Sequence, residues 1–198
     1  MLDYISGDIA EITPTYVVLD VNGIGYSLNI SLNTYAVIRD SKGCKLFTHL
    51  AFKNEASTPV GMVLFGFADN TERTTFLHLL SVSGVGANTA RLILSSMTPS
   101  EVQQAIVSGN VGLLQKVKGI GTKSAQRIII DLKDKLSKES LDKDFNFAPL
   151  NSAREEALGA LVMLGFVKNN AEKAIDKIIK DNANCTVEEL IKLSLKVL

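Results

Sequence analysis

The chain has 198 residues and no net charge, with 46% hydrophobic and 21% charged residues, a balance typical of a soluble globular protein. No apolar run approaches the roughly 20 residues that cross a bilayer, so no membrane span is expected. The first residues, MLDYISGDIAE, include two aspartates and no basic region, so we expect no secretory signal and a cytoplasmic location. Cys44 and Cys185 lie far apart and are expected to be free thiols.

Residues 1–66 are predicted to form a small β-barrel. Asn22-Gly23 predicts a tight hairpin because both residues tolerate positive φ. Five short, largely antiparallel strands fit an OB-like barrel, although strand counting does not separate it from other small barrels. The stretches predicted as strands are rich in Val, Ile, Tyr, Phe and Thr, and they are YISGDIAEI, TYVVLDV, GYSLNIS, CKLFTHLAFK and VLFGF.

From about residue 71 the apolar spacing becomes helical, and residues 67–137 contain one motif twice. SVSGVGANTARLIL (81–94) and KVKGIGTKSAQRII (116–129) align without a gap at an offset of 35 residues. Each copy reads as a helix, a hydrophobic-Gly-hydrophobic-Gly turn and a second helix. We therefore predict a tandem helix-hairpin-helix domain.

The glycine spacing excludes two nucleotide-binding loops. A Walker loop, GxxxxGK[ST], needs a lysine directly after a glycine, and Lys123 does not follow one. A dinucleotide-binding loop needs a third glycine or alanine three residues after Gly86 or Gly121, where Thr89 and Ser124 stand. It also needs a preceding strand, whereas VGLLQKV is predicted to be helical.

The turns instead favour contact with a nucleic-acid backbone. A helix N-terminus after a glycine turn presents backbone N–H groups to an anion, and such contacts carry no base information. Residues 67–137 have a net charge of +3, concentrated around the second turn. Asn88 stands where the second turn has Lys123, so the second hairpin is expected to bind phosphate more strongly. The alternative is that both turns only connect packed helices. The candidate DNA-binding residues are Gly84, Gly86, Asn88, Thr89, Lys116, Lys118, Gly119, Gly121, Thr122, Lys123 and Arg127.

Residues 138–152 are charged and polar, with one proline and no periodicity, and are predicted to be a flexible linker. A second helical pattern begins at Ala153. The remaining 153–198 can form only a small three-helix, UBA-like domain. The predicted fold class is thus α+β multidomain, with an OB-like barrel, a tandem helix-hairpin-helix domain and a C-terminal helical domain.

This ordered set of parts resembles the RuvA family, the Holliday-junction-binding subunits of the bacterial branch-migration machine, along essentially the full chain. The resemblance implies a non-catalytic subunit that holds a four-way junction open for the hexameric ATP-driven motor RuvB in recombination and repair. It also implies a homotetramer, or two tetramers face to face, with the junction resolvase RuvC as a further partner. The resemblance is carried by VNGIGY (21–26), THLAFKNEA (48–56), LFGF (64–67), ERTTFLHLLSVSGVG (72–86), VKGIGTKSAQRII (117–129) and EALGALVMLGFVKNNAEKAI (156–175).

The resemblance assigns two further sites. Family members have acidic residues at the tip of a barrel hairpin, where this chain has Asn54 and Glu55, so only Glu55 keeps the charge. An ordinary exposed loop glutamate is the alternative for Glu55. The C-terminal domain is implied to bind the motor through an apolar face, with membership of the domain's own core as the alternative. The candidate motor-binding residues are Leu161, Leu164, Gly165, Phe166 and Ala171.

No catalytic constellation is visible in the sequence. His49 and His78 have no matched Cys, Ser or carboxylate motif, and acidic residues are not paired at metal-ligand spacing. We therefore expect no metal, no other cofactor and no enzymatic activity. The alternatives from other classes are a helix-hairpin-helix structure-specific nuclease or its accessory subunit, and a scaffold that binds only protein.

Overall fold

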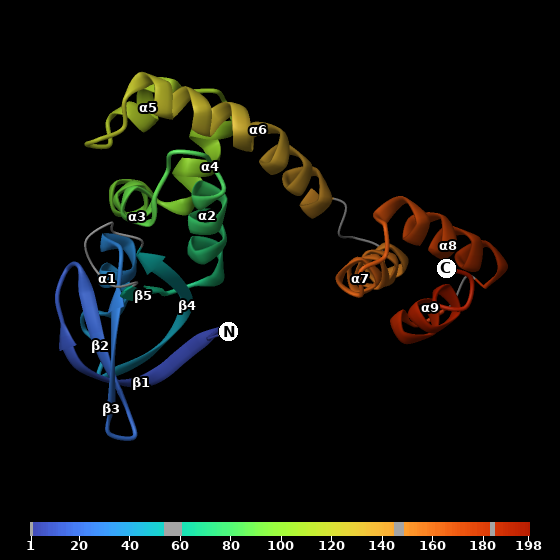
Figure 1. Ribbon diagram of the computed structural model, residues 1–198, viewed down its shortest axis with the longest axis horizontal. Helices are drawn as coiled ribbons and strands as arrows, with labels where there is room; N and C mark the ends of the chain where they lie inside the picture. Colours follow the sequence, from blue (N-terminus) through green and yellow to red (C-terminus); the bar gives the residue numbers. More distant parts are fainter. Residues whose placement is uncertain (1, 54–60, 145–148, 183–184) are drawn as a thin grey trace. The chain divides into compact units, whose positions relative to one another are not determined.

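The computed structural model describes residues 2–53, 61–144, 149–182 and 185–198 (Figure 1). The chain divides into two compact units, Met1–Ser137 and Lys138–Leu198. Among the helices in the described ranges, none is both long enough and apolar enough to span a membrane. Each unit is described by itself below.

The first unit begins with a closed five-stranded barrel in the order β1-β2-β3-β5-β4. Neighbouring strands are antiparallel except β3 and β5, which pair in parallel at Asn29 and Phe65. All five predicted strands are present, and the OB-like barrel is confirmed. The strands are β1 Tyr4–Ile12, β2 Tyr16–Val21, β3 Ile24–Asn29, β4 Gly43–Lys53 and β5 Gly61–Phe67.

The period-two alternation of the strands builds the barrel interior. Val17, Leu19 and Leu28 point inward and have no exposed surface. Asn22 and Gly23 form the predicted hairpin turn, with φ angles of 52° and 84°. These positive angles match the right-handed twist of the flanking strands.

Five helices follow the barrel in the first unit, and a sixth, α1 (Leu32–Ile38), is inserted between β3 and β4. The sequence analysis did not predict α1. Its N-cap residue, Ser31, accepts a hydrogen bond from the backbone N–H of Thr34 through its hydroxyl oxygen. The other helices are α2 Asn70–Leu80, α3 Ala87–Ser96, α4 Pro99–Val107, α5 Val111–Gln115 and α6 Thr122–Asp144.

The barrel and these helices share buried packing. Phe65 and Phe67, at the end of β5, lie 5.1 and 4.9 Å from the ring centroid of Phe76 on α2. The three aromatic residues belong to the same hydrophobic cluster as Ile93 on α3 and Ile128 on α6. The predicted boundary between residues 66 and 67 is therefore a change of secondary structure inside one compact unit.

A buried carboxylate, Glu72 on α2, ties α1 to α2. Its side chain accepts hydrogen bonds from the hydroxyl groups of Ser31 and Thr34, and the residue is 1% exposed. The Thr34 oxygen also accepts the backbone N–H of Ala68 at 3.0 Å. Burial raises the pKa of Glu72 because the charged form loses hydration, an effect that outweighs the opposing hydroxyl bonds.

The raised pKa predicts how Glu72 affects stability at different pH values. The contribution of a group with a raised folded-state pKa is fully present below its unfolded pKa and is lost as the pH rises through the folded pKa. In urea unfolding at about pH 4 and about pH 7, the unfolding free energy of the wild type minus that of Glu72→Gln should therefore fall as the pH rises. A difference that grows with pH would contradict this assignment.

The C-terminal unit contains three packed helices, α7 (Pro149–Met163), α8 (Lys168–Asp181) and α9 (Val187–Ser194). Its core is built from fully buried residues such as Ala157, Leu161 and Ile175. The Arg154 guanidinium on α7 donates to the Asp176 carboxylate on α8 at 2.7 Å. The predicted small helical domain is confirmed.

The range 138–152, predicted to be a flexible linker, is helical at both ends. Helix α6 continues to Asp144, and α7 begins at Pro149. Lysine, glutamate and leucine are good helix formers even where no apolar period marks a buried face. Proline is compatible with the first helical position because its missing N–H has no partner there.

Candidate nucleic-acid interface

The two glycine turns have the same backbone geometry. Gly84 and Gly119 occupy the same place in the two turns, with φ angles of 90° and 91°. Each turn is closed by two backbone hydrogen bonds of three-residue span, 3.0 to 3.2 Å long. The bonds run from Val82 to Leu79 and Val85 to Val82 in the first turn, and from Val117 to Leu114 and Ile120 to Val117 in the second.

Hydrophobic residues hold each turn against the core. Val82 and Val117 are each 2% exposed, and Val85 and Ile120 are each 6% exposed. The glycines that alternate with them are exposed. The side chains therefore fix the turn from inside while its backbone faces outward.

The second glycine of each turn directly precedes the following helix, where glycine is a favoured N-cap residue but is not required by the backbone. Gly86 has an extended conformation with φ of −86°, and Gly121 is not among the residues of positive φ. A Cβ atom at either position would meet no protein atom within 4 Å. The missing side chain instead leaves the start of the following helix open to close approach from outside.

Those helix starts present free donor positions. The first helical bonds are donated by Ala90 to Gly86 at 2.9 Å and by Ala125 to Gly121 at 3.0 Å. The N–H groups of residues 87–89 and 122–124 precede these bonds and have no acceptor within their own helix. The helix dipole adds partial positive charge at the same place, so each turn has the chemistry of an anion site.

The two turns differ in charge. Lys118, Lys123 and Arg127 surround the second turn and are exposed, whereas the first turn presents Asn88. The hydroxyl oxygen of Thr122 accepts a 2.7 Å hydrogen bond from the Gln115 amide and keeps its own hydrogen free to donate. The predicted asymmetry is thus one of charge and not of backbone geometry.

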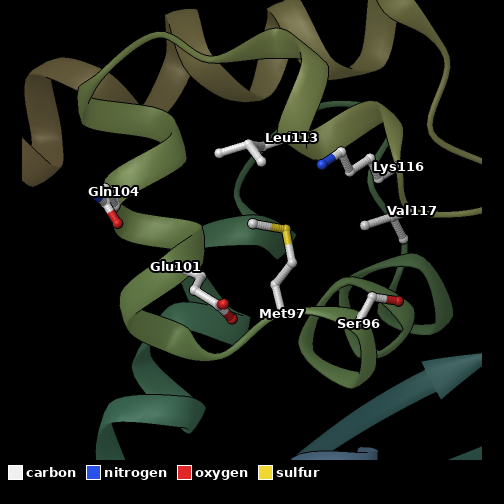
Figure 2. Close-up of a pocket in the computed structure, with 7 residues that line it drawn as sticks. All are labelled: Ser96, Met97, Glu101, Gln104, Leu113, Lys116 and Val117. Atoms are coloured by element: carbon white, nitrogen blue, oxygen red, sulfur yellow. The ribbon is translucent and has the colours of Figure 1, made fainter.

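Lys116 is placed differently from the other basic residues. It lines a pocket of about 400 Å³ (Figure 2), and its ammonium group is directed into that pocket. Across the pocket, Glu101 accepts hydrogen bonds from the backbone N–H and hydroxyl of Thr98, and these bonds lower the pKa of Glu101. The other lining residues are Ser96, Met97, Gln104, Leu113 and Val117.

Comparison with known proteins assigns the chain. Three family models match, described as RuvA N terminal domain (residues 1–66), SAM-like helix-hairpin-helix tandem (76–134) and RuvA, C-terminal domain (152–198). Proteins named Holliday junction branch migration complex subunit RuvA are 47% identical in Christiangramia forsetii and 48% in Cytophaga hutchinsonii, with 100% of both chains covered. The corresponding protein of Bacteroides fragilis is 45% identical over 99% of both chains.

The chain belongs to the RuvA family. The helix-hairpin-helix match covers both glycine turns, so the repeat is a recognised tandem and not a chance similarity. The barrel-hairpin tip and the motor-binding face are the two sites that were predicted from resemblance to this family. Asn54 and Glu55 lie outside the described residues, and the β4–β5 pairing ends just before them at Lys53 and Gly61.

The predicted motor-binding residues separate into two groups. Leu161 and Ala171 have no exposed surface and belong to the domain core, so they cannot form a contact face without unfolding it. Phe166 packs partly against that core, and Gly165 occupies the turn between α7 and α8 with φ of 97°. Leu164 is strongly exposed, at 62%, and Gly165 is exposed as well.

Sequence reasoning missed the neighbours of Leu164. Val162, Met163 and Val167 are 42%, 91% and 65% exposed, and together with Leu164 they form what we term the α7–α8 patch. The sequence signal for this patch was the apolar run LVMLGFV, which is too long for one helix face to bury.

The described residues contain no cluster of His, Cys, Asp and Glu side chains that could hold a metal ion. His49 packs at 5.6 Å from the Phe76 ring centroid, and burial together with the Arg73 charge lowers its pKa. His49 is therefore part of the packing between barrel and helices.

The glycines of each turn predict contrasting stabilities. Gly84→Ala and Gly119→Ala should each lower the unfolding free energy by about 1–2 kcal/mol, because a Cβ is strained at positive φ. Gly86→Ala and Gly121→Ala should lower it by less, about 0.5 kcal/mol, because the new Cβ meets open space and only the N-cap preference for glycine over alanine is lost. Urea unfolding of the four variants checks this, and equal losses at all four positions would contradict the assigned roles.

Proposed function

We propose that this chain binds four-way DNA junctions as the non-catalytic recognition subunit of a branch-migration complex. The observation that carries the proposal is the pair of equivalent turns, each of which leaves the N–H groups at the start of the following helix open to an external surface. The printed name of its relatives, Holliday junction branch migration complex subunit, supports both the junction and the complex. The family match favours this function over the nuclease alternative.

Each hairpin is proposed to bind phosphate through main-chain N–H groups. Two hairpins in one compact unit suit two phosphates on one duplex, and main-chain donors give binding that is independent of sequence. Lys118, Lys123 and Arg127 add charge at the second turn, which therefore contributes more of the affinity and of its salt dependence. Lys116 is the weakest of the predicted basic contacts, because its ammonium group, although the residue is exposed, is directed into the pocket.

Four identical subunits are proposed to surround the junction, because each of four arms can then meet the same pair of hairpins. A second tetramer on the opposite face and a RuvC-type resolvase are further proposed partners. The chemical work is assigned to a RuvB-type ATPase, which is held through the α7–α8 patch.

The charge asymmetry between the turns gives a direct test. Asn88→Lys should tighten DNA binding and steepen the dependence of log K on log salt by about 0.9 per bound subunit, because it adds one phosphate contact. Lys123→Ala combined with Gly121→Ala should weaken binding strongly and make the slope shallower. Fluorescence anisotropy with a labelled four-way junction at several salt concentrations measures both.

Two results would contradict this account. Unchanged affinity in the Lys123→Ala, Gly121→Ala variant would favour a scaffold that binds only protein. Mg²⁺-dependent cleavage of branched DNA by highly purified protein, abolished by replacing one acidic residue, would favour the nuclease.

Lys177→Ala in the C-terminal unit, where the side chain is also exposed, is the charge-matched control and should change neither affinity nor slope.

Glu55 is proposed to repel phosphate as duplexes exchange strands. Glu55→Gln removes the charge and keeps the size, so junction affinity should be unchanged or tighter while the branch-migration rate changes. The rate is measured with the motor and ATP on a synthetic junction. An unchanged rate would remove this role.

The α7–α8 patch is proposed to bind the motor. Leu164→Asp and Met163→Asp should each weaken binding to a RuvB-type motor by about tenfold or more, since a charge would have to be desolvated in an apolar contact. Both side chains are exposed, so the melting temperature should hardly change. Titration calorimetry measures the affinity, with Val197→Asp, 56% exposed near the C-terminus, as the control. Equal effects of all three changes would contradict the patch.

A further inference from the structure

Helix α1 joins the barrel to the end of α3, the helix that begins at the first glycine turn (Figure 1). The amide of Asn33 donates two hydrogen bonds, to the carbonyl oxygens of Leu94 at 2.6 Å and Met97 at 3.0 Å. The backbone N–H of Leu32 donates to the hydroxyl of Ser95 at 3.1 Å. Carbonyls at a helix C-terminus lack partners in their own helix, so the Asn33 amide on α1 supplies hydrogen-bond donors that the end of α3 would otherwise lack.

A second attachment lies nearer the middle of α3. The Arg91 guanidinium donates to the carbonyl oxygen of Thr15 at 3.0 Å and to the Asn29 side-chain oxygen at 3.1 Å, both in the barrel. Partial burial lowers the pKa of Arg91. Arg91, the basic residue of α3, thus makes its hydrogen bonds to the barrel.

Helix α1 is itself fixed on its other side. Ser31 and Thr34 donate to the buried Glu72 carboxylate of α2, and both hydroxyl oxygens also accept backbone N–H groups. Every donor in this cluster therefore has a defined acceptor. A network of this kind holds one geometry, because any shift leaves a buried polar group unpaired.

The direction of α3 sets the position of its N-terminal donors. Helix α3 has 10 residues, so it is about 15 Å long at 1.5 Å per residue. A tilt of about 10° at the attached end would move the first turn by about 2.5 Å, more than a hydrogen bond tolerates. The first turn lacks a lysine at residue 88, where a long flexible side chain would compensate for such a shift.

From these contacts we infer that Asn33 is a positioning residue for DNA binding: it fixes the direction of α3 and thereby places the N–H groups of residues 87–89 against phosphate. This inference rests on the proposed function. Asn33 acts through the first hairpin, because both of its hydrogen bonds are to the end of α3, where they add a polar attachment to the core packing of Ile93 and Leu94.

The test is a pair of double-mutant cycles on binding to a four-way junction. Asn33→Ala should weaken binding by about tenfold, the value of one charge-assisted hydrogen bond. It should weaken binding equally in the Gly121→Ala background, and hardly at all in the Gly86→Ala background, where the first contact is already obstructed. A residue that merely stabilised the fold would show the same factor in both backgrounds.

Val37→Ala, one turn further along α1 and 68% exposed, is the matched control and should leave binding unchanged in every background. Asn29→Ala removes one acceptor of Arg91 without changing the charge, should show the same pattern as Asn33→Ala with a smaller factor, and replaces it if that variant does not fold. All affinities are measured below the melting temperature of each variant.

The outcomes separate the two claims. An equal factor in both backgrounds, or no loss of affinity in folded Asn33→Ala and Asn29→Ala, overturns the positioning role while the proposed function stands. Unchanged affinity in both Gly86→Ala and Gly121→Ala overturns the proposed function and the positioning role with it. If Asn33→Ala lowers the affinity only in proteins with an intact first hairpin, that result supports both the positioning role and the proposed function.

Discussion

The proposed DNA-binding surface depends on a turn whose backbone is fixed before any ligand arrives. In each copy a glycine at positive φ reverses the chain, and a buried aliphatic residue on either side anchors it, such as Val82 and Val85. The donors are main-chain groups, so the conformational entropy of ordering them is lost during folding and not during binding. On the proposed function, this preorganisation is what lets a chain of zero net charge bind a polyanion.

The same constraint extends to the whole first unit. A donor at a helix start is useful only if the helix has a fixed direction, and here the direction comes from shared packing between barrel and helices. Phe65 and Phe67 enter the helical core, while Glu72 and Asn33 make the polar attachments. Packing against the barrel therefore helps to fix the position of both hairpins. The C-terminal helices form a separate compact unit.

The sequence predicted the features that local patterns determine. Strand alternation, the Asn22-Gly23 turn and the 35-residue repeat are all properties of short windows, and the five strands and two hairpins follow from them. Helix α1 was missed because LNTYAVI is short and its polar residues are explained only by distant partners, Glu72 and the end of α3. The side to which Lys116 points and the burial of Leu161 and Ala171 likewise depend on tertiary packing that no window contains.

The central claim is that main-chain N–H groups at two equivalent helix starts bind phosphate. Amide NMR of ¹⁵N-labelled protein titrated with a four-way junction observes these groups directly. The account predicts that the amide proton resonances of residues 87–89 and 122–124 move downfield together, as expected for new hydrogen bonds to anionic oxygen. The contrary result is that only resonances of residues around Lys118, Lys123 and Arg127 shift, while the amide protons of both helix starts do not move. That result would contradict the claim and would mean that side-chain charge alone binds the DNA.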